Sequence, residues 1–163
     1  MKPILKYILF FALINLPLVS CNDNYVSSIP DYWVSLKIDL SVGSYVNFRN
    51  STNKYLLFEK PITVSDGVGY GGILVYTGVG FDDAGNSNYY AFDMSCPYEH
   101  QIDVRVYPDL SGLGRVVCKK CGSVFDVSYG VGNPVSGKAK EVLKRYKTIY
   151  TTTLSGDILY ITR

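Results

Sequence analysis

Short runs of alternating apolar and polar residues dominate the chain from residue 32 onward. In the clearest run, Val34 to Leu40, every second position is apolar and the positions between are polar. A period of two residues is typical of a β-strand that buries one face. Further short strand-like runs, bounded by turn residues, predict strands at 54–59, 61–65, 73–76, 89–94, 102–107, 115–117, 123–127, 147–153 and 157–162.

Glycine- and asparagine-rich segments separate these strands. The run from Gly67 to Gly72 superficially resembles a phosphate-binding loop, but such loops precede a helix, whereas a strand-like segment follows here. We therefore expect a bent strand or hairpin. One short helix is expected at 139–146, and the basic residues of 138–147 would line its solvated face. Many short strands broken by turns predict an all-β fold, a sandwich or barrel.

Composition supports this fold class and excludes some functions. The 163 residues are enough for one domain, and the 15 tyrosines and 15 glycines favour strands and turns. Lys2 and Lys6 lie in a segment that we expect to be removed. The remaining chain has 14 basic and 14 acidic residues, so its formal net charge is zero. A neutral chain argues against a nucleic-acid partner, because such binding depends on basic contacts to phosphates.

The N-terminal 20 residues have the pattern of a secretory signal peptide. Two lysines precede an apolar run from Tyr7 to Ile14, and Pro17 follows. This run is too short to span a bilayer, since a spanning helix needs ~20 residues. We expect residues 1–20 to be a signal peptide.

The end of this segment, Leu18-Val19-Ser20-Cys21, resembles the lipobox of bacterial lipoproteins. The resemblance implies that Cys21 receives lipid and becomes the mature N-terminus; ordinary secretion with Cys21 as a thiol is the alternative. Residues 21–31 would be the lipidated tether and 32–163 the domain. The implied location is the bacterial cell envelope, with the lipid in a membrane. Asn22 favours the outer membrane by the sorting rules of such lipoproteins.

The remaining cysteines are the best candidates for chemistry. With Cys21 assigned to lipid, three are left, and one disulfide would leave an unpaired thiol. The only histidine, His100, lies four residues after Cys96 and 18 before Cys118, which starts a Cys-x2-Cys pair with Cys121. Three thiolates and one imidazole are a ligand set that zinc uses in tetrahedral sites.

From residue 89 to its end the chain resembles the Rieske [2Fe–2S] domain. The resemblance rests on a first loop AFDMSCPY, a second loop CKKCGSVFD, and a later glycine loop GNPVSGKA; these are residues 91–98, 118–126 and 132–139. A leucine, a tyrosine and a closing strand follow in the family's order, as Leu143, Tyr146 and 156–161. The resemblance implies a Rieske-like all-β fold with a small subdomain that carries two cysteine loops.

The ligand set departs from that of the family, in which two Cys hold one iron and two His the other. Cys96 and Cys118 match the thiolate positions, but Tyr98 and Cys121 occupy the histidine positions. Four donors remain if His100 takes part. The loss of both family histidines argues against a quinol- or oxygenase-linked role, and we do not expect an enzyme.

Four interpretations stay open at this point. The first is a single zinc or iron ion held by Cys96, His100, Cys118 and Cys121. The second is a modified [2Fe–2S] cluster on the same donors, which would make the protein a one-electron carrier with a redox or envelope protein as partner. The third is a metal-free, disulfide-stapled binding or structural module. The fourth is a redox-active Cys118–Cys121 pair, whose thiol pKa the neighbouring lysines would lower.

Overall fold

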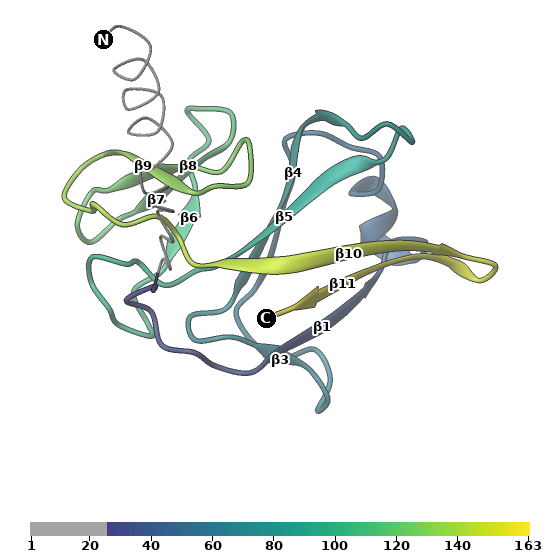
Figure 1. The fold of residues 1–163 in the computed structure, drawn as a ribbon, viewed down its shortest axis with the longest axis horizontal. Coiled ribbons are helices and arrows are strands. Elements are labelled where there is room, and N and C mark those ends of the chain that lie inside the picture. Colours follow the sequence, from purple (N-terminus) through teal and green to yellow (C-terminus); the bar gives the residue numbers. More distant parts are fainter. Residues whose placement is uncertain (1–25) are drawn as a thin grey trace, which may run out of the picture.

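The computed structural model of the chain describes residues 26–163. The predicted signal peptide, the predicted lipidation site Cys21 and residues 22–25 of the predicted tether lie outside the described residues. Within them, all regular elements except one 3-10 helix are strands, which confirms the all-β fold class (Figure 1). In chain order the elements are β1 (Val34–Asp39), η1 (Gly43–Asn47), β2 (Tyr55–Phe58), β3 (Gly67–Val68), β4 (Ile73–Phe81), β5 (Ser87–Asp93), β6 (Val106–Pro108), β7 (Arg115–Cys118), β8 (Val124–Asp126), β9 (Asn133–Ser136), β10 (Arg145–Thr153) and β11 (Gly156–Thr162).

The strands form two antiparallel sheets. The larger has the order β2-β4-β5-β10-β11-β1-β3, and the smaller has the order β6-β7-β8-β9. Figure 1 shows the larger sheet curling towards a closed barrel, with the smaller sheet beside one end of β5 and β10. The chain passes from β5 into the small sheet and returns to the barrel at β10. The small sheet is therefore the two-loop subdomain that the sequence predicts.

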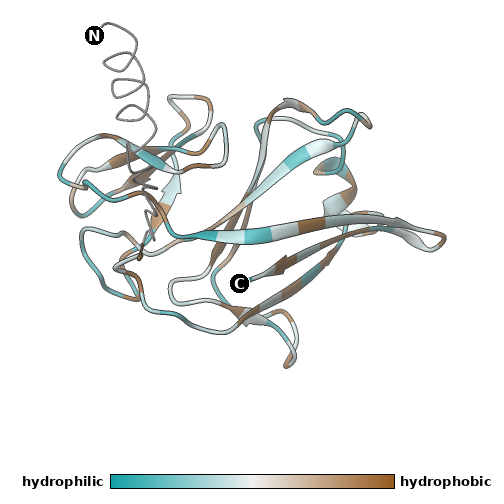
Figure 2. Cartoon of the chain, viewed as in Figure 1, coloured by the Kyte–Doolittle hydropathy of each residue, from teal (hydrophilic) through white to brown (hydrophobic). Residues whose placement is uncertain are grey.

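One hydrophobic core fills the inside of the large sheet. The alternating apolar residues of β1 point into it, and β1 pairs with β11 so that Leu36 lies opposite Ile161. Figure 2 shows hydrophobic residues recurring along β1 and β11, with paler residues between them. The main members of this core are Val34, Leu36, Ile38, Leu40, Ile73, Val75, Ala91, Tyr146, Leu159 and Ile161.

A second core lies between the two sheets. The start of β4 is buried on both faces: Ile73 and Val75 face the first core, whereas Leu74 and Tyr76 face the second. Burial on both faces explains why this strand is a continuous apolar run and not an alternating one. The second core holds Leu74, Tyr76, Phe92, Met94, Val106, Val116, Phe125, Val127 and Leu143, together with Cys96 and Cys118.

The helix predicted at 139–146 is wrong. Residues 139–144 have no regular secondary structure, and β10 begins at Arg145, which pairs with β5. Buried side chains recur here at three- and four-residue intervals, which imitates the helical period. The backbone instead finds tertiary partners, as the Leu143 N–H donates to the Gly132 carbonyl. The basic residues of 138–147 therefore do not form a helix face, and Lys144 among them is buried.

Other boundaries also differ from the predicted ones. Residues 61–65 form turns, because the Asp66 carboxylate accepts the Ile62 and Thr63 N–H groups, and the paired strand is β3. Only the end of 102–107 becomes a strand. The short edge strand β9 contains Pro134 and was not predicted. These differences lie in short or irregular segments, where local side-chain contacts override a weak pattern.

The described part of the predicted tether packs against the domain. Ile29 is 1% exposed, and the buried Lys144 ammonium donates hydrogen bonds to the Ile29 and Pro30 carbonyls at 2.8 Å and to the Asp31 carboxylate at 2.7 Å. The Ser28 hydroxyl donates to a carbonyl of the first cysteine loop at 3.3 Å. Residues 28–31 are therefore attached to the domain, and Ser28 lies next to the first cysteine loop.

Candidate metal centre

Three cysteines from two loops converge on one point. Cys96 follows the end of β5, Cys118 ends β7, and Cys121 lies in the turn between β7 and β8. Their three sulfur atoms lie within 4.8 Å of one another, and the Cys96 and Cys121 sulfurs are 3.7 Å apart. All three are free thiols. The convergence predicted from the sequence is confirmed, and the sulfurs are close enough to hold one metal ion.

Strand pairing in the small sheet brings the loops together. Val106 of β6 pairs with Cys118 of β7, and the Val106 N–H donates to the Met94 carbonyl just before Cys96. The chain thus folds back on itself beside Cys96, and β7 places Cys118 next to it. We call residues 96–100 loop 1 and residues 118–122 loop 2.

A buried carboxylate fixes the start of loop 1. Asp93 is fully buried at the end of β5, and its oxygens accept the N–H groups of Tyr70 (2.9 Å), Gly71 (3.0 Å) and Ser95 (2.7 Å) and the hydroxyl of Tyr146 (2.5 Å). Burial and the Asp93 charge raise the pKa of Tyr146. The glycine-rich run, residues 67–72, therefore donates hydrogen bonds to Asp93 and holds the chain just before loop 1 in place. As expected from the sequence, strand β4 and not a helix follows this run.

The thiols of Cys96 and Cys121 differ in burial, and their pKa values are shifted in opposite directions. Cys96 is fully buried, and this burial raises its pKa to about 12, although the backbone N–H groups of Tyr98 and Glu99 point at its sulfur and oppose the shift. For Cys121, which is only partly buried, burial is outweighed by hydrogen bonds from the side chain and backbone of Ser123, so its pKa is lowered. A bound cation would offset the cost of ionising Cys96, because coordination favours the thiolate.

Ser123 is a supporting residue that the sequence did not reveal. It is buried, and its hydroxyl oxygen accepts the N–H groups of Lys138 at 3.0 Å and Ala139 at 2.9 Å. The Cys121 thiol donates to the same oxygen at 3.1 Å. When Cys121 is ionised, the Ser123 hydroxyl can instead donate its proton to the thiolate, which is the form it favours. Only the coordinates show this arrangement, since a serine two residues after a cysteine carries no signal by itself.

The other predicted residues of loop 1 lie away from the sulfurs. Tyr98 is 47% exposed, and the Lys138 ammonium lies 5.9 Å from its ring centroid. His100 is exposed, and its nitrogens do not belong to the group of atoms within 4.8 Å of one another. Its backbone N–H donates to the Cys96 carbonyl at 3.0 Å. The structure brings three of the four predicted ligands together, and His100 as a ligand stays a prediction.

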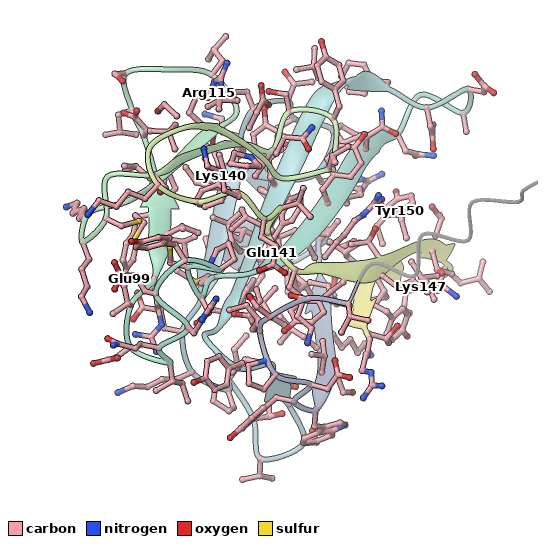
Figure 3. The ribbon with its side chains drawn as sticks, turned by 60° about the vertical axis from the view of Figure 1, so that its left-hand side comes forward. Glu99, Arg115, Lys140, Glu141, Lys147 and Tyr150 are labelled. Atoms are coloured by element: carbon pink, nitrogen blue, oxygen red, sulfur yellow. The ribbon has the colours of Figure 1, made fainter. Side chains whose placement is uncertain are left out.

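An acidic residue of loop 1 was overlooked in the sequence. The Glu99 side chain is 14% exposed, and its carboxylate lies 3.1 Å from the Lys120 ammonium of loop 2. Lys120 also donates to the Gln101 side chain at 2.7 Å. Figure 3 shows Glu99 on the side of the molecule where the sulfur atoms are seen. The signal that could have revealed Glu99 is its spacing: it follows Cys96 by three residues, as Cys121 follows Cys118.

No family model matches the sequence, and a search of curated proteins also finds no match. Within residues 26–163, no helix has both the length and the hydropathy needed to cross a membrane. The geometry and chemistry of the cysteine site itself are therefore the guide to what this protein does.

Proposed function

We propose that this protein is a lipid-tethered, extracytoplasmic metal-binding protein in which Cys96, Cys118 and Cys121 hold one zinc or iron ion. The observation that carries the proposal is the sulfur spacing. A tetrahedron with metal–sulfur bonds of about 2.3 Å has edges of about 3.8 Å, and the Cys96 and Cys121 sulfurs are 3.7 Å apart. The third sulfur lies within 4.8 Å of both. One sulfur pair thus matches an edge of a coordination tetrahedron, and the third donor of the right type lies close to both.

The chemistry around the sulfurs also favours a cation. Backbone N–H groups point at the sulfurs of Cys96 and Cys121, and the Ser123 hydroxyl faces Cys121. Hydrogen bonds to a thiolate stabilise the form that binds metal and orient the ligand. When bound, the ion would offset most of the negative charge of the thiolates and crosslink the loops between β5 and β6 and between β7 and β8. A structural zinc site crosslinks loops in this way, and an iron ion at the same position could carry one electron. Neither role requires a catalytic side chain.

The same geometry weighs against the competing interpretations. A disulfide between any two of the three thiols leaves the third thiol beside it, and a disulfide requires sulfurs about 2.05 Å apart. In a [2Fe–2S] cluster the four ligands divide between two irons, which separates one pair from the other. Three sulfurs around one point are better suited to a single ion. An electron-transfer protein with a modified cluster remains the second candidate, supported by the resemblance of the loops to the Rieske domain.

The lipid anchor is part of this proposal. With lipid on Cys21, the seven residue steps from Cys21 to Ser28 span at most about 25 Å, and Ser28 contacts loop 1 through the Pro97 carbonyl. The metal site would then remain near the membrane surface of the cell envelope. An envelope protein, or a redox protein if the ion is iron, is the class of partner that this position implies.

Metal analysis of the anaerobically purified, detergent-solubilised full-length protein tests the proposal. We expect one zinc or iron per chain, no band of an iron–sulfur cluster in the visible spectrum, and no loss of two hydrogens in non-reducing mass spectrometry. Metal-free protein carrying an internal disulfide would refute the metal site. Two irons with two acid-labile sulfides would establish the cluster instead.

A further inference from the structure

We propose that Glu99 supplies the fourth ligand of the metal, so that the site is Cys₃Glu. This inference rests on the proposed function, because it concerns the ion held by the three thiolates. Carboxylate oxygens bind zinc at about 2.0–2.2 Å and are established members of its ligand set. The argument for Glu99 comes from a comparison of the two loops.

Both loops fold into the same turn. In loop 1 the His100 N–H donates to the Cys96 carbonyl at 3.0 Å, and in loop 2 the Gly122 N–H donates to the Cys118 carbonyl at 2.8 Å. In each case the donor is the fourth residue after a buried cysteine. The donor also has a left-handed backbone, with φ of 53° at His100 and 72° at Gly122. The two loops therefore share the same closing hydrogen bond and the same left-handed residue at its donor.

This correspondence places Glu99 at the position of Cys121. Both are the third residue after the first cysteine of their loop. The exposure pattern agrees, because Glu99 and Cys121 are partly buried, whereas the residue before each of them, Tyr98 or Lys120, is exposed. In loop 2 the side chain at this position points to the metal-binding point. When the ion is bound, the Glu99 side chain would take the same direction from the opposite loop; in the structure its carboxylate pairs with Lys120 instead.

The correspondence also argues against His100 as the fourth ligand. His100 has the position of Gly122, and a Cβ atom added at Gly122 would have no atom within 4 Å. A side chain at this position of the turn therefore projects into solvent. This agrees with the exposure of His100 and with its absence from the group of converging ligand atoms. A left-handed backbone is expected here for the turn itself, and asparagine, aspartate and histidine tolerate it better than most residues.

The charges at the junction of the loops fit a carboxylate that approaches the ion. Glu99 pairs with Lys120 at 3.1 Å, and Lys120 directly precedes Cys121. In the structure the carboxylate oxygens lie outside the 4.8 Å group of sulfurs, so binding requires the Glu99 carboxylate to leave Lys120 and turn towards the sulfurs. A divalent ion with three thiolates and one carboxylate carries a net charge of −2, which the neighbouring lysines Lys119 and Lys120 offset.

The test compares metal binding by four variants of the full-length protein. Glu99→Gln removes the charged ligand with little change of shape, and Glu99→Cys supplies a fourth thiolate. His100→Gly removes the imidazole while keeping the left-handed turn. Lys120→Gln is the matched control, because it removes the ion pair of Glu99 without removing a ligand. Zinc affinity is measured by competition with a chelator, and cobalt(II) reports the ligands through its visible and near-ultraviolet spectrum.

We expect Glu99→Gln to lower zinc affinity by more than the ~10–100-fold that loss of an outer-shell partner costs, and to shift the cobalt d–d bands. Glu99→Cys should bind cobalt with thiolate charge-transfer absorption increased in proportion to four thiolates instead of three. His100→Gly should leave the cobalt spectrum as in the wild type, and Lys120→Gln should change affinity less than Glu99→Gln.

Three results would overturn the inference. A cobalt spectrum that changes in His100→Gly but not in Glu99→Gln assigns the fourth position to His100. Unchanged spectra and affinities in both variants assign it to solvent or an exogenous ligand. In these two cases the wild type binds metal, so the proposed function stands. A wild-type protein that takes up neither zinc nor cobalt overturns both the inference and the proposed function.

Discussion

The hydroxyl oxygen of Ser123 lies 3.1 Å from the sulfur of Cys121, in a buried position beside the metal-binding point. Two backbone N–H groups of the segment after β9, those of Lys138 and Ala139, donate to the same oxygen. Ser123 therefore joins loop 2 to the chain that returns to the barrel. It also stabilises the Cys121 thiolate, which lowers the pKa of this thiol.

Replacing Ser123 with alanine should affect both roles. The change leaves the buried N–H of Ala139 and the partly buried N–H of Lys138 without their acceptor, so the free energy of unfolding should fall by about 1–3 kcal/mol. The pKa of Cys121 should rise, because the group that stabilises its thiolate is lost. At neutral pH the metal-free variant should therefore alkylate at Cys121 more slowly than the wild type, as measured by mass spectrometry after iodoacetamide treatment.

Ser136→Ala is the matched control for this experiment, since Ser136 is exposed on β9. Equal alkylation rates in Ser123→Ala and the wild type, with the control behaving normally, would show that Ser123 does not tune the thiol.

Gly137 permits the close contact between this segment and loop 2. A Cβ atom at Gly137 would lie 2.8 Å from the Gly122 carbonyl oxygen and would also overlap the Cα atom of Ser123. Gly137→Ala should displace loop 2, weaken zinc binding and destabilise the fold by about 1–3 kcal/mol. Gly85→Ala is the control, because Gly85 has a similar positive φ of 80° but no atom within 4 Å of the added Cβ. Equal zinc affinity and stability in the two variants would contradict this role.

Asp93 should be one of the most sensitive positions of the fold. Its carboxylate accepts three backbone N–H groups and the Tyr146 hydroxyl. An amide at this position has only one acceptor oxygen and presents a donor to other donors, so Asp93→Asn should cost about 3 kcal/mol or more in urea unfolding. Tyr146→Phe removes only one of these bonds and should cost less. The account fails here if Tyr146→Phe is the more destabilising change.

Acid should weaken the attachment of the N-terminal segment. The hydrogen bond from Lys144, its charge and the charge of Arg163 hold the pKa of Asp31 below 3.8. A lowered folded-state pKa contributes stability above the unfolded pKa, and this contribution is lost as the pH falls through the folded pKa. Asp31→Asn should therefore be less stable than the wild type at pH 7, and the difference should shrink below about pH 4.

Urea unfolding across this pH range measures the effect, with the exposed Asp83→Asn as control. A difference between Asp31→Asn and the wild type that is constant from pH 7 to pH 3 would contradict the role assigned to the Asp31 charge.

The sequence pattern was sufficient for most of the fold. The alternation from Val34 to Leu40 predicts β1, and the glycine- and asparagine-rich segments mark most of the turns. The pattern failed at 139–146, where buried residues at helical spacing belong to an irregular segment whose backbone bonds with distant residues. Such tertiary partners are invisible in a single sequence, so periodicity alone gave the wrong secondary structure.

The cysteine site was partly predictable. The odd number of cysteines and the two-loop resemblance predicted that Cys96, Cys118 and Cys121 meet, and they do. The roles of Ser123 and of Asp93 depend on contacts across the fold, which local spacing does not encode. Glu99 is a different case, because its spacing from Cys96 equals that of Cys121 from Cys118. This spacing is visible in the sequence, but a carboxylate in a cysteine loop is a weaker signal for a metal ligand than a cysteine or a histidine.

X-ray absorption at the metal edge of the anaerobically purified full-length protein tests the central claim most directly. It counts the sulfur neighbours of the bound ion and measures their distances. Our account predicts one ion with three sulfur neighbours at about 2.3 Å and one oxygen neighbour at about 2.0–2.2 Å. A spectrum with a second metal neighbour, or with fewer than three sulfurs, would contradict the single-ion site at Cys96, Cys118 and Cys121.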